Sequence, residues 1–264
     1  MQTTQWLLSA IFGLLLVGSV AAQTAPTQEE RQALAPTGKL RIGFVSTSPV
    51  HVTQVSGEQR GVAIDVGKEL ARRLGVPYEW VGYSSVKQIV LSAQTDQWDV
   101  IFFAATPARA KLMDFSPPLV EVEIGYLVPA GSSLYTLADV DKPGIRIAVL
   151  VPSVVDEHLS ASLKSATLLR VPSPADPADL VASGKADAFA HLKPFLFRSL
   201  AKVPGLRVLD GHIFFDRISI AVPKDRSISM AYVRRFVEDV KASGLVKDAI
   251  DRAGLRAVVV APSQ

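Results

Sequence analysis

Cysteine and asparagine are both absent from the 264 residues of this chain. Without cysteine the fold has no disulfide to stabilise it, and there is no thiol near the N-terminus to which a lipid anchor could be attached. Without asparagine the chain has no N-glycosylation sequon. The fold must therefore rest on an ordinary apolar core, which the 48% of hydrophobic residues can supply.

The sequence motifs of many nucleotide-dependent, metal-dependent and hydrolytic enzymes are also missing. There is no G-x-x-x-x-G-K-[ST] phosphate loop, no G-x-G-x-x-G, no H-E-x-x-H and no G-x-S-x-G elbow. The four histidines, at positions 51, 158, 191 and 212, are far apart and show no metal-ligand spacing. We therefore expect neither a metal nor a cofactor.

Charges of both signs are mixed along the chain. It carries 28 Lys and Arg against 25 Asp and Glu, a net charge of +3, with no basic block or helix face suited to nucleic acid. This balance implies only a modest attraction for small anions. We expect no nucleic-acid partner.

The first 22 residues carry no charged side chain and predict a cleaved signal peptide. Trp6 to Val17 is an almost unbroken apolar run, and small residues follow it. Val20 and Ala22 suit the −3 and −1 positions of a signal peptidase site. An uncleaved membrane anchor is the alternative, but the run is short for a span of roughly 20 residues. We expect residues 1–22 to be removed and the mature protein to be free of the membrane.

Two α/β units follow a polar, proline-containing stretch, residues 23–37, that we expect to be a tether. The first unit alternates strands at 39–45, 77–81 and 99–104 with helices at 62–74 and 84–94. The second alternates strands at 145–151, 167–171 and 186–190 with helices at 153–163, 176–184 and 194–201. Such alternation predicts parallel sheets with helices on both faces. Two β-like segments, 125–128 and 218–222, join the units, and a helix at 229–242 and a last helix to about 253 end the chain.

Seven short motifs succeed one another along the chain. They are Gly38–Gly43, Gly61–Val66, Trp98–Ile101, Thr106–Ala110, Asp114–Pro118, Leu137–Val140 and Gly184–Ala188. Singly each is weak, but in this order and spacing they are specific. Over residues 38–255 the chain resembles the bacterial extracellular solute-binding proteins of family 3, which include the polar amino-acid receptors of ABC importers.

The resemblance implies an α/β, type II periplasmic binding protein fold. Each of its two lobes would be a mainly parallel sheet flanked by helices, and two hinge strands would join them. Lobe one would comprise residues 38–126 plus 222–264, and lobe two residues 127–221. The resemblance also implies a periplasmic, monomeric, non-enzymatic protein. It would capture a small anionic metabolite, an amino acid or an organic acid, in the cleft and deliver it to the permease subunits of an ABC importer.

Arg109 is the first residue that the resemblance places in the ligand site, because the arginine of the family's T-P-x-R motif binds the ligand carboxylate. A planar guanidinium can hold a carboxylate through two parallel hydrogen bonds. The alternative is a surface arginine paired with Asp114. Thr106 either caps the following helix or donates its hydroxyl to the ligand. Ala104 belongs to an apolar stretch that replaces a hydroxyl-rich segment of the family, so we expect fewer polar contacts there.

In lobe two, Ser153 and Val154 match the family's loop that offers N–H groups and a hydroxyl to the carboxylate. A helix N-terminus suits an anion, although Ser153 could be an N-cap only. Leu192 stands where amino-acid receptors place the acidic residue that meets the ammonium. Its neighbours His191 and Lys193 are candidates for a second anionic group of the ligand, a structural histidine and a solvated lysine being the alternatives. We therefore expect a preference for carboxylates without an α-ammonium group.

Two further functions are compatible with this fold. Some periplasmic relatives are cyclic-acid dehydratases, in which Lys193 or His191 would act as general acid. Binding modules of sensor proteins usually continue into a transmembrane or signalling segment, so the end of this chain at Gln264 favours a free-standing receptor.

Overall fold

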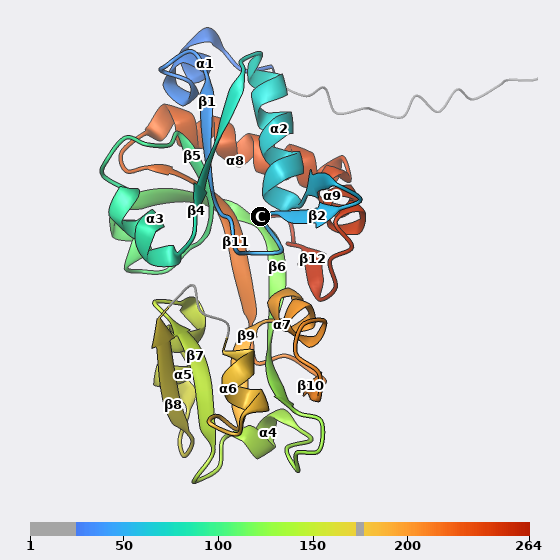
Figure 1. The fold of residues 1–264 in the computed structure, drawn as a ribbon. Coiled ribbons are helices and arrows are strands. Elements are labelled where there is room, and N and C mark those ends of the chain that lie inside the picture. Colours follow the sequence, from blue (N-terminus) through green and yellow to red (C-terminus); the bar gives the residue numbers. More distant parts are fainter. Residues whose placement is uncertain (1–24, 173–176) are drawn as a thin grey trace, which may run out of the picture.

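Lobe one is built from both ends of the chain and appears in the upper half of Figure 1. The computed structural model describes residues 25–172 and 177–264, so the expected signal peptide lies outside the described residues. The strands of this lobe are β1 (Leu40–Val45), β2 (Thr53–Val55), β3 (Glu58–Arg60), β4 (Tyr78–Tyr83), β5 (Val100–Ala104) and β12 (Val258–Val260). Its helices are α1 (Gln28–Leu34), α2 (Val62–Leu74), α3 (Val86–Ser92), the 3₁₀ turn η1 (Arg109–Lys111), α8 (Ser227–Ala242) and α9 (Leu245–Arg252).

Lobe two is a continuous segment of chain and appears in the lower half of Figure 1. Its strands are β7 (Arg146–Val151), β8 (Thr167–Pro172), β9 (Ala188–Leu192) and β10 (Leu206–Val208). Its helices are α4 (Leu137–Val140), α5 (Val154–Ser162), α6 (Ala178–Ala182) and α7 (Lys193–Leu200). Both alternating patterns predicted from the sequence are therefore present.

Two long strands, β6 (Met113–Pro129) and β11 (Phe215–Pro223), connect the lobes. Through these two strands the sheets of both lobes form one continuous sheet. Its strand order is β4-β1-β5-β11-β6-β9-β7-β8, and β10 and β12 also pair with β6. The strands β4, β1 and β5 are parallel to one another, as are β8, β7 and β9. Of the two connecting strands, β11 runs antiparallel to β5 and β6 runs antiparallel to β9. Each lobe thus has the mainly parallel sheet that the sequence predicts.

The crossings between the lobes lie earlier in the chain than expected. Along β6, residues up to Glu123 pair with β11, and from Ile124 onward the partner is β9. Ile124 belongs to the hydrophobic core of lobe two, whereas Ile218 on β11 already belongs to the core of lobe one. The expected boundaries at 126/127 and 221/222 therefore move to about 123/124 and 214/215.

In each lobe, an arginine at the start of one strand is hydrogen-bonded to an aspartate just before the neighbouring strand. In lobe one, Asp99 accepts hydrogen bonds from the main-chain N–H of Arg41 at 2.8 Å and from its guanidinium at 2.7 Å. In lobe two, Asp187 accepts the corresponding bonds from Arg146 at 2.8 Å and 3.0 Å. The Arg146 guanidinium holds the pKa of Asp187 below its usual value. Two of the family motifs, around Asp99 and Asp187, thus have a structural role.

Side-chain caps begin some of the helices, including one in a stretch where the sequence predicts none. Ser85 caps α3 by accepting a hydrogen bond from the N–H of Gln88. The stretch expected to be a tether instead contains α1, where Thr27 and Glu30 form a capping box. Glu30 also pairs with Arg235 on α8 at 2.5 Å, which fastens α1 to lobe one. Within the two described ranges, no helix combines the length and apolar character needed to cross a membrane.

Candidate functional site

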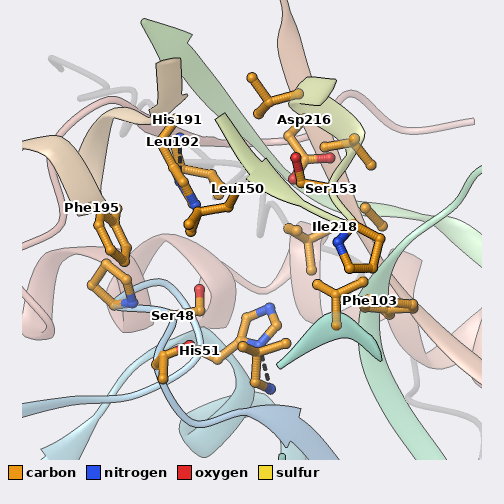
Figure 2. Close-up of a pocket in the computed structure, with 18 of the residues that line it drawn as sticks. Ser48, His51, Phe103, Leu150, Ser153, His191, Leu192, Phe195, Asp216 and Ile218 are labelled. Atoms are coloured by element: carbon orange, nitrogen blue, oxygen red, sulfur yellow. Dashed lines mark hydrogen bonds between the residues drawn. The ribbon is translucent and has the colours of Figure 1, made fainter. Parts of the chain in front are cut away.

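A cavity of about 450 Å³ lies between the lobes, beside the crossing strands. Its walls come from both lobes, and Figure 2 shows several of the residues that line it. Apolar side chains form much of the surface, among them Val45, Val86, Phe103, Leu150, Phe195 and Ile218. The volume lies within the range of small-molecule sites, and a mostly apolar wall with a few polar groups is typical of them.

Arg109 projects into this cavity from the turn that follows β5. The turn is held by Thr106, whose hydroxyl accepts a hydrogen bond from the N–H of Arg109 at 3.4 Å. The guanidinium donates to the carbonyl oxygen of Ala104 at 2.8 Å and lies 4.0 Å from the ring centre of Phe103. Arg109 is only 5% exposed, and among the described residues no carboxylate lies within 4.0 Å of it. Burial consequently lowers the pKa of Arg109, although Asp216 opposes the shift.

Asp216 is a second buried charge in the same cavity, and the sequence analysis did not identify it. It lies in β11 and is 6% exposed, and the main-chain N–H of Arg217 donates to its carboxylate. Burial raises the pKa of Asp216 to about 6, and the attraction of Arg109 only partly offsets this. Arg109 and Asp216 thus form a separated pair of opposite charges that faces the cavity.

His51 lines the lobe-one wall, in the loop that follows β1. It is 3% exposed, and its Nδ1 accepts a hydrogen bond from the N–H of Val45 at 3.0 Å. Its Nε2 is buried and has no hydrogen-bond partner among the described residues. Burial lowers the pKa of His51 to about 4, so the ring is neutral at neutral pH.

Lobe two contributes the N-terminus of α5 to the cavity. Ser153 caps this helix by accepting a hydrogen bond from the N–H of Asp156 at 3.1 Å, and both Ser153 and Val154 line the cavity. The partial positive charge of a helix N-terminus favours an anion there. Ser153 is therefore an N-cap that also lines the cavity, and its contact with a ligand stays a prediction.

Five of the seven residues expected in the site line the cavity, and two do not. The five are Ala104, Arg109, Ser153, Val154 and His191. Thr106 is absent from the described lining, and its hydroxyl accepts the hydrogen bond from the N–H of Arg109. Lys193 is also absent from it; its ammonium is buried and pairs with Glu123 on β6 at 2.6 Å. Lys193 is thus neither a solvated lysine nor a group that borders the cavity.

The charges around the cavity favour an anion. Arg109, Arg198 and Lys202 line it, against Asp216 as the acidic residue. Leu192 lines it as well, so the position at which amino-acid receptors carry an acid is apolar here. In the part of the chain that the structure describes, no three His, Asp or Glu side chains gather in a group that could hold a metal ion.

Two α/β lobes, two connecting strands and a ligand-sized cavity between the lobes define a type II periplasmic binding protein. Residues 40–253 match the family model of the bacterial extracellular solute-binding proteins, family 3, and the chain belongs to that family.

Several proteins similar to this chain are described as amino-acid-binding proteins or as related to them. A probable amino-acid ABC transporter periplasmic-binding protein of Sinorhizobium fredii is 26% identical over 190 residues, which cover 69% of this chain and 61% of that relative. ArgBP from T. maritima, solved as a mutant, has a TM-score of 0.72 at 24% identity and covers 85% of this chain and 99% of its own. An ancestral amino acid-binding protein, described as a precursor of cyclohexadienyl dehydratase, has a TM-score of 0.70 at 23% identity, with 84% and 97% covered.

Proposed function

We propose that this protein is the periplasmic receptor of an ABC importer and binds a small carboxylate-bearing metabolite between its lobes. The observation that carries the proposal is Arg109, a buried cation that faces the cavity with no carboxylate of the described chain within 4.0 Å. A buried charge without a partner is costly, and a ligand carboxylate would supply that partner. The named function of the Sinorhizobium fredii relative supports the same class of protein.

Asp216 extends the proposal from a carboxylate to an amino acid. The sequence-based expectation of a ligand without an ammonium group rested on the apolar Leu192, because no other acid was placed in the site. Asp216 supplies a buried carboxylate elsewhere in the same cavity, opposite in sign to Arg109. A zwitterion can place its carboxylate on Arg109 and its ammonium on Asp216, so that both buried charges gain a partner.

A thermal-shift and calorimetry panel tests this function directly. It compares L-leucine with 4-methylpentanoate and L-phenylalanine with 3-phenylpropanoate, alongside the other common amino acids and simple dicarboxylates. A ligand at a hundred times its dissociation constant adds about 2.7 kcal/mol to the free energy of unfolding, which is readily measured. We expect at least one amino acid to stabilise the protein. If no carboxylate in the panel does so, the proposed function is wrong.

The dehydratase alternative has one observation in its favour, which is the raised pKa of Asp216, about 6. A carboxyl group that keeps its proton close to neutral pH can act as a general acid. The two acids expected from the sequence are poorly suited, because burial lowers the pKa of His191 to about 3 and Lys193 is paired with Glu123. Prephenate therefore belongs in the panel, and product formation by the pure protein would assign the site to the dehydratases.

Closure of the lobes is the expected consequence of binding. The ligand would contact Arg109 on lobe one and the α5 N-terminus at Ser153 on lobe two, so it would favour the closed arrangement and shift the population towards it. The crossings at 123/124 and 214/215 are short enough for a few backbone torsions to absorb the rotation. Small-angle scattering should show a smaller radius of gyration with a stabilising amino acid from the panel. An unchanged radius at saturation would contradict closure.

Removal of the leader is expected when the protein is exported. Residues 1–22 have the apolar run and small-residue end of a signal peptide, and the cleavage site expected from the sequence follows Ala22. The intact mass of the protein from the periplasm of an expressing bacterium should correspond to a chain that begins at Gln23. Recovery of the full 264-residue chain in the membrane fraction would show instead that the apolar run is an uncleaved anchor.

A further inference from the structure

One ring nitrogen of His51 is used by the fold, and the other is buried without a hydrogen-bond partner in the described chain. Nδ1 accepts a hydrogen bond from the N–H of Val45 through its lone pair, so it carries no proton. The single proton of the neutral ring must then lie on Nε2. In Figure 2 the edge of the ring that carries this nitrogen turns towards the middle of the cavity. His51 therefore presents a buried N–H donor without a partner in the described chain.

The loop that carries His51 is braced, which fixes the direction of this donor. The N–H of Ser46 donates to the carbonyl oxygen of Tyr83 at 2.8 Å, and its hydroxyl donates to the same oxygen at 3.0 Å. The N–H of His51 donates to the carbonyl oxygen of Ser48 at 3.1 Å. On the other side, a Cβ at Gly61 would lie 2.3 Å from the His51 carbonyl oxygen, so only glycine permits this close approach. The fold thus holds the donor in place before any ligand arrives.

Lobe two places a second imidazole with the same protonation beside the cavity. Nδ1 of His191 accepts a hydrogen bond from the N–H of Leu192 at 2.7 Å, so its proton also lies on Nε2. The ring of His191 is stacked on Phe195, with ring centres 4.4 Å apart. One neutral imidazole from each lobe therefore borders the same space.

We infer that His51 is a ligand-binding residue whose Nε2–H donates a hydrogen bond to an acceptor oxygen in the side chain of the bound solute. Figure 2 shows His51 on the wall opposite Asp216, away from the charge that would hold the amine. The inference rests on the proposed function and narrows it to amino acids that carry an oxygen acceptor beyond their carboxylate. A neutral donor can select such an oxygen without adding charge to a cavity that is already cationic.

Two substitutions separate this role from a structural one. Asparagine at this position keeps an acceptor for the Val45 N–H but has no group where Nε2 stands, whereas glutamine keeps an N–H donor near Nε2 and loses the acceptor near Nδ1. If His51 only braces its loop, His51→Asn should bind ligands as the parent does. If His51 is a ligand donor, His51→Gln should be the variant that retains affinity.

Three matched amino-acid pairs serve as probes: threonine with valine, asparagine with leucine, and methionine sulfoxide with methionine. We expect the parent to bind the oxygen-bearing member of at least one pair tenfold or more tightly, the size of one well-placed hydrogen bond. This preference should disappear in His51→Asn and persist in His51→Gln. His212→Asn is the control, because His212 is exposed and is not among the described residues that line the cavity.

The outcomes distinguish the inference from the function on which it rests. If no amino acid or other carboxylate stabilises the parent, the proposed function fails. If amino acids bind but the parent shows no preference within any pair, or His51→Asn retains the preference, the inference fails and the function stands. Nitrogen NMR of the ligand-free protein adds a check that needs no ligand, since a proton on Nδ1 of His51 would also overturn the inference.

Discussion

Replacing Arg109 with alanine is expected to weaken amino-acid binding by about 100-fold or more and to leave the fold intact. Hydrogen bonds to charged groups contribute about 1.5–3 kcal/mol each, so two parallel bonds to a carboxylate contribute about 3–6 kcal/mol. A loss of 1.4 kcal/mol corresponds to a tenfold change in affinity. The substitution also removes a buried cation that has no carboxylate within 4.0 Å in the described chain, so the ligand-free protein should not lose stability through a broken ion pair. Calorimetry gives the affinity, and thermal unfolding checks the fold.

Two further variants make the result on Arg109 specific. Arg217→Ala is the matched control, because Arg217 also lies beside the site on β11 but its exposed side chain pairs with Glu121 at 2.8 Å. It should bind as the parent does. Arg109→Lys keeps the charge and loses the planar pair of donors, so its affinity should fall between those of the parent and Arg109→Ala. Parent-like binding by Arg109→Ala would show that the carboxylate is held elsewhere.

Replacing Asp216 with asparagine is expected to abolish the preference for an amino acid over its deaminated analogue. The parent should bind the better of L-leucine and L-phenylalanine at least tenfold more tightly than the same acid without the amine. In Asp216→Asn the affinity for the amino acid should fall by about 10- to 150-fold, the equivalent of one charged hydrogen bond. The affinity for the deaminated analogue should stay the same or rise, because the buried negative charge is gone. If the amino acid keeps its full advantage in Asp216→Asn, the ammonium has another partner.

The same substitution should stabilise the ligand-free protein, and only at high pH. Burial raises the pKa of Asp216 from 3.8 to about 6 in the folded protein. The folded state therefore holds this proton more tightly than the unfolded state, and the resulting stability is complete below pH 3.8 and is lost as the pH rises through about 6. At about pH 7.5 the ionised carboxylate lowers the free energy of unfolding by about 2–3 kcal/mol.

Denaturant titrations at two pH values test the direction of this change in the free energy of unfolding. Asp216→Asn should be more stable than the parent at about pH 7.5 and close to it at about pH 4. Glu121→Gln is the control, since that carboxylate pairs with Arg217 on the surface of the crossing strands. A parent that is as stable as Asp216→Asn at about pH 7.5 would show that Asp216 is not destabilised by ionisation.

The local signals in the sequence were sufficient for the two alternating α/β patterns and for the positions of Arg109 and Ser153 at the ends of elements. Arg109 follows the buried strand β5 in a recognisable motif. Ser153 caps a helix that comes directly after the strand β7. Both positions depend on neighbours in the sequence, and both side chains line the cavity. The two crossings were harder to place, because β6 and β11 are continuous strands whose change of lobe depends on pairing with distant residues.

Asp216 and Lys193 show where sequence reasoning failed. The sequence pattern predicts a β-like segment at 218–222 and places Asp216 before it, although Asp216 lies two residues from the buried Ile218 and so on the same face of the strand. That spacing was a usable signal of an inward-facing acid. Lys193 follows two cavity residues and was expected to join them. Its side chain instead lies across Gly125, where an added Cβ would come within 2.9 Å of the lysine Cε, and it ends at Glu123.

The chain enters and leaves lobe two at residues that lie side by side. The N–H of Ile124, where the chain enters this lobe, donates to the carbonyl oxygen of Phe214, where it returns, at 3.0 Å. The intervening segment has a hydrophobic core of its own. Residues 124–214 can therefore diverge as a block, while lobe one and β11 keep Arg109 and Asp216, the residues that we propose hold the carboxylate and the amine. A receptor built this way can acquire a new substrate by changing one half of its cleft, and the apolar Leu192 in lobe two is compatible with the proposed ammonium partner, Asp216, on the other half.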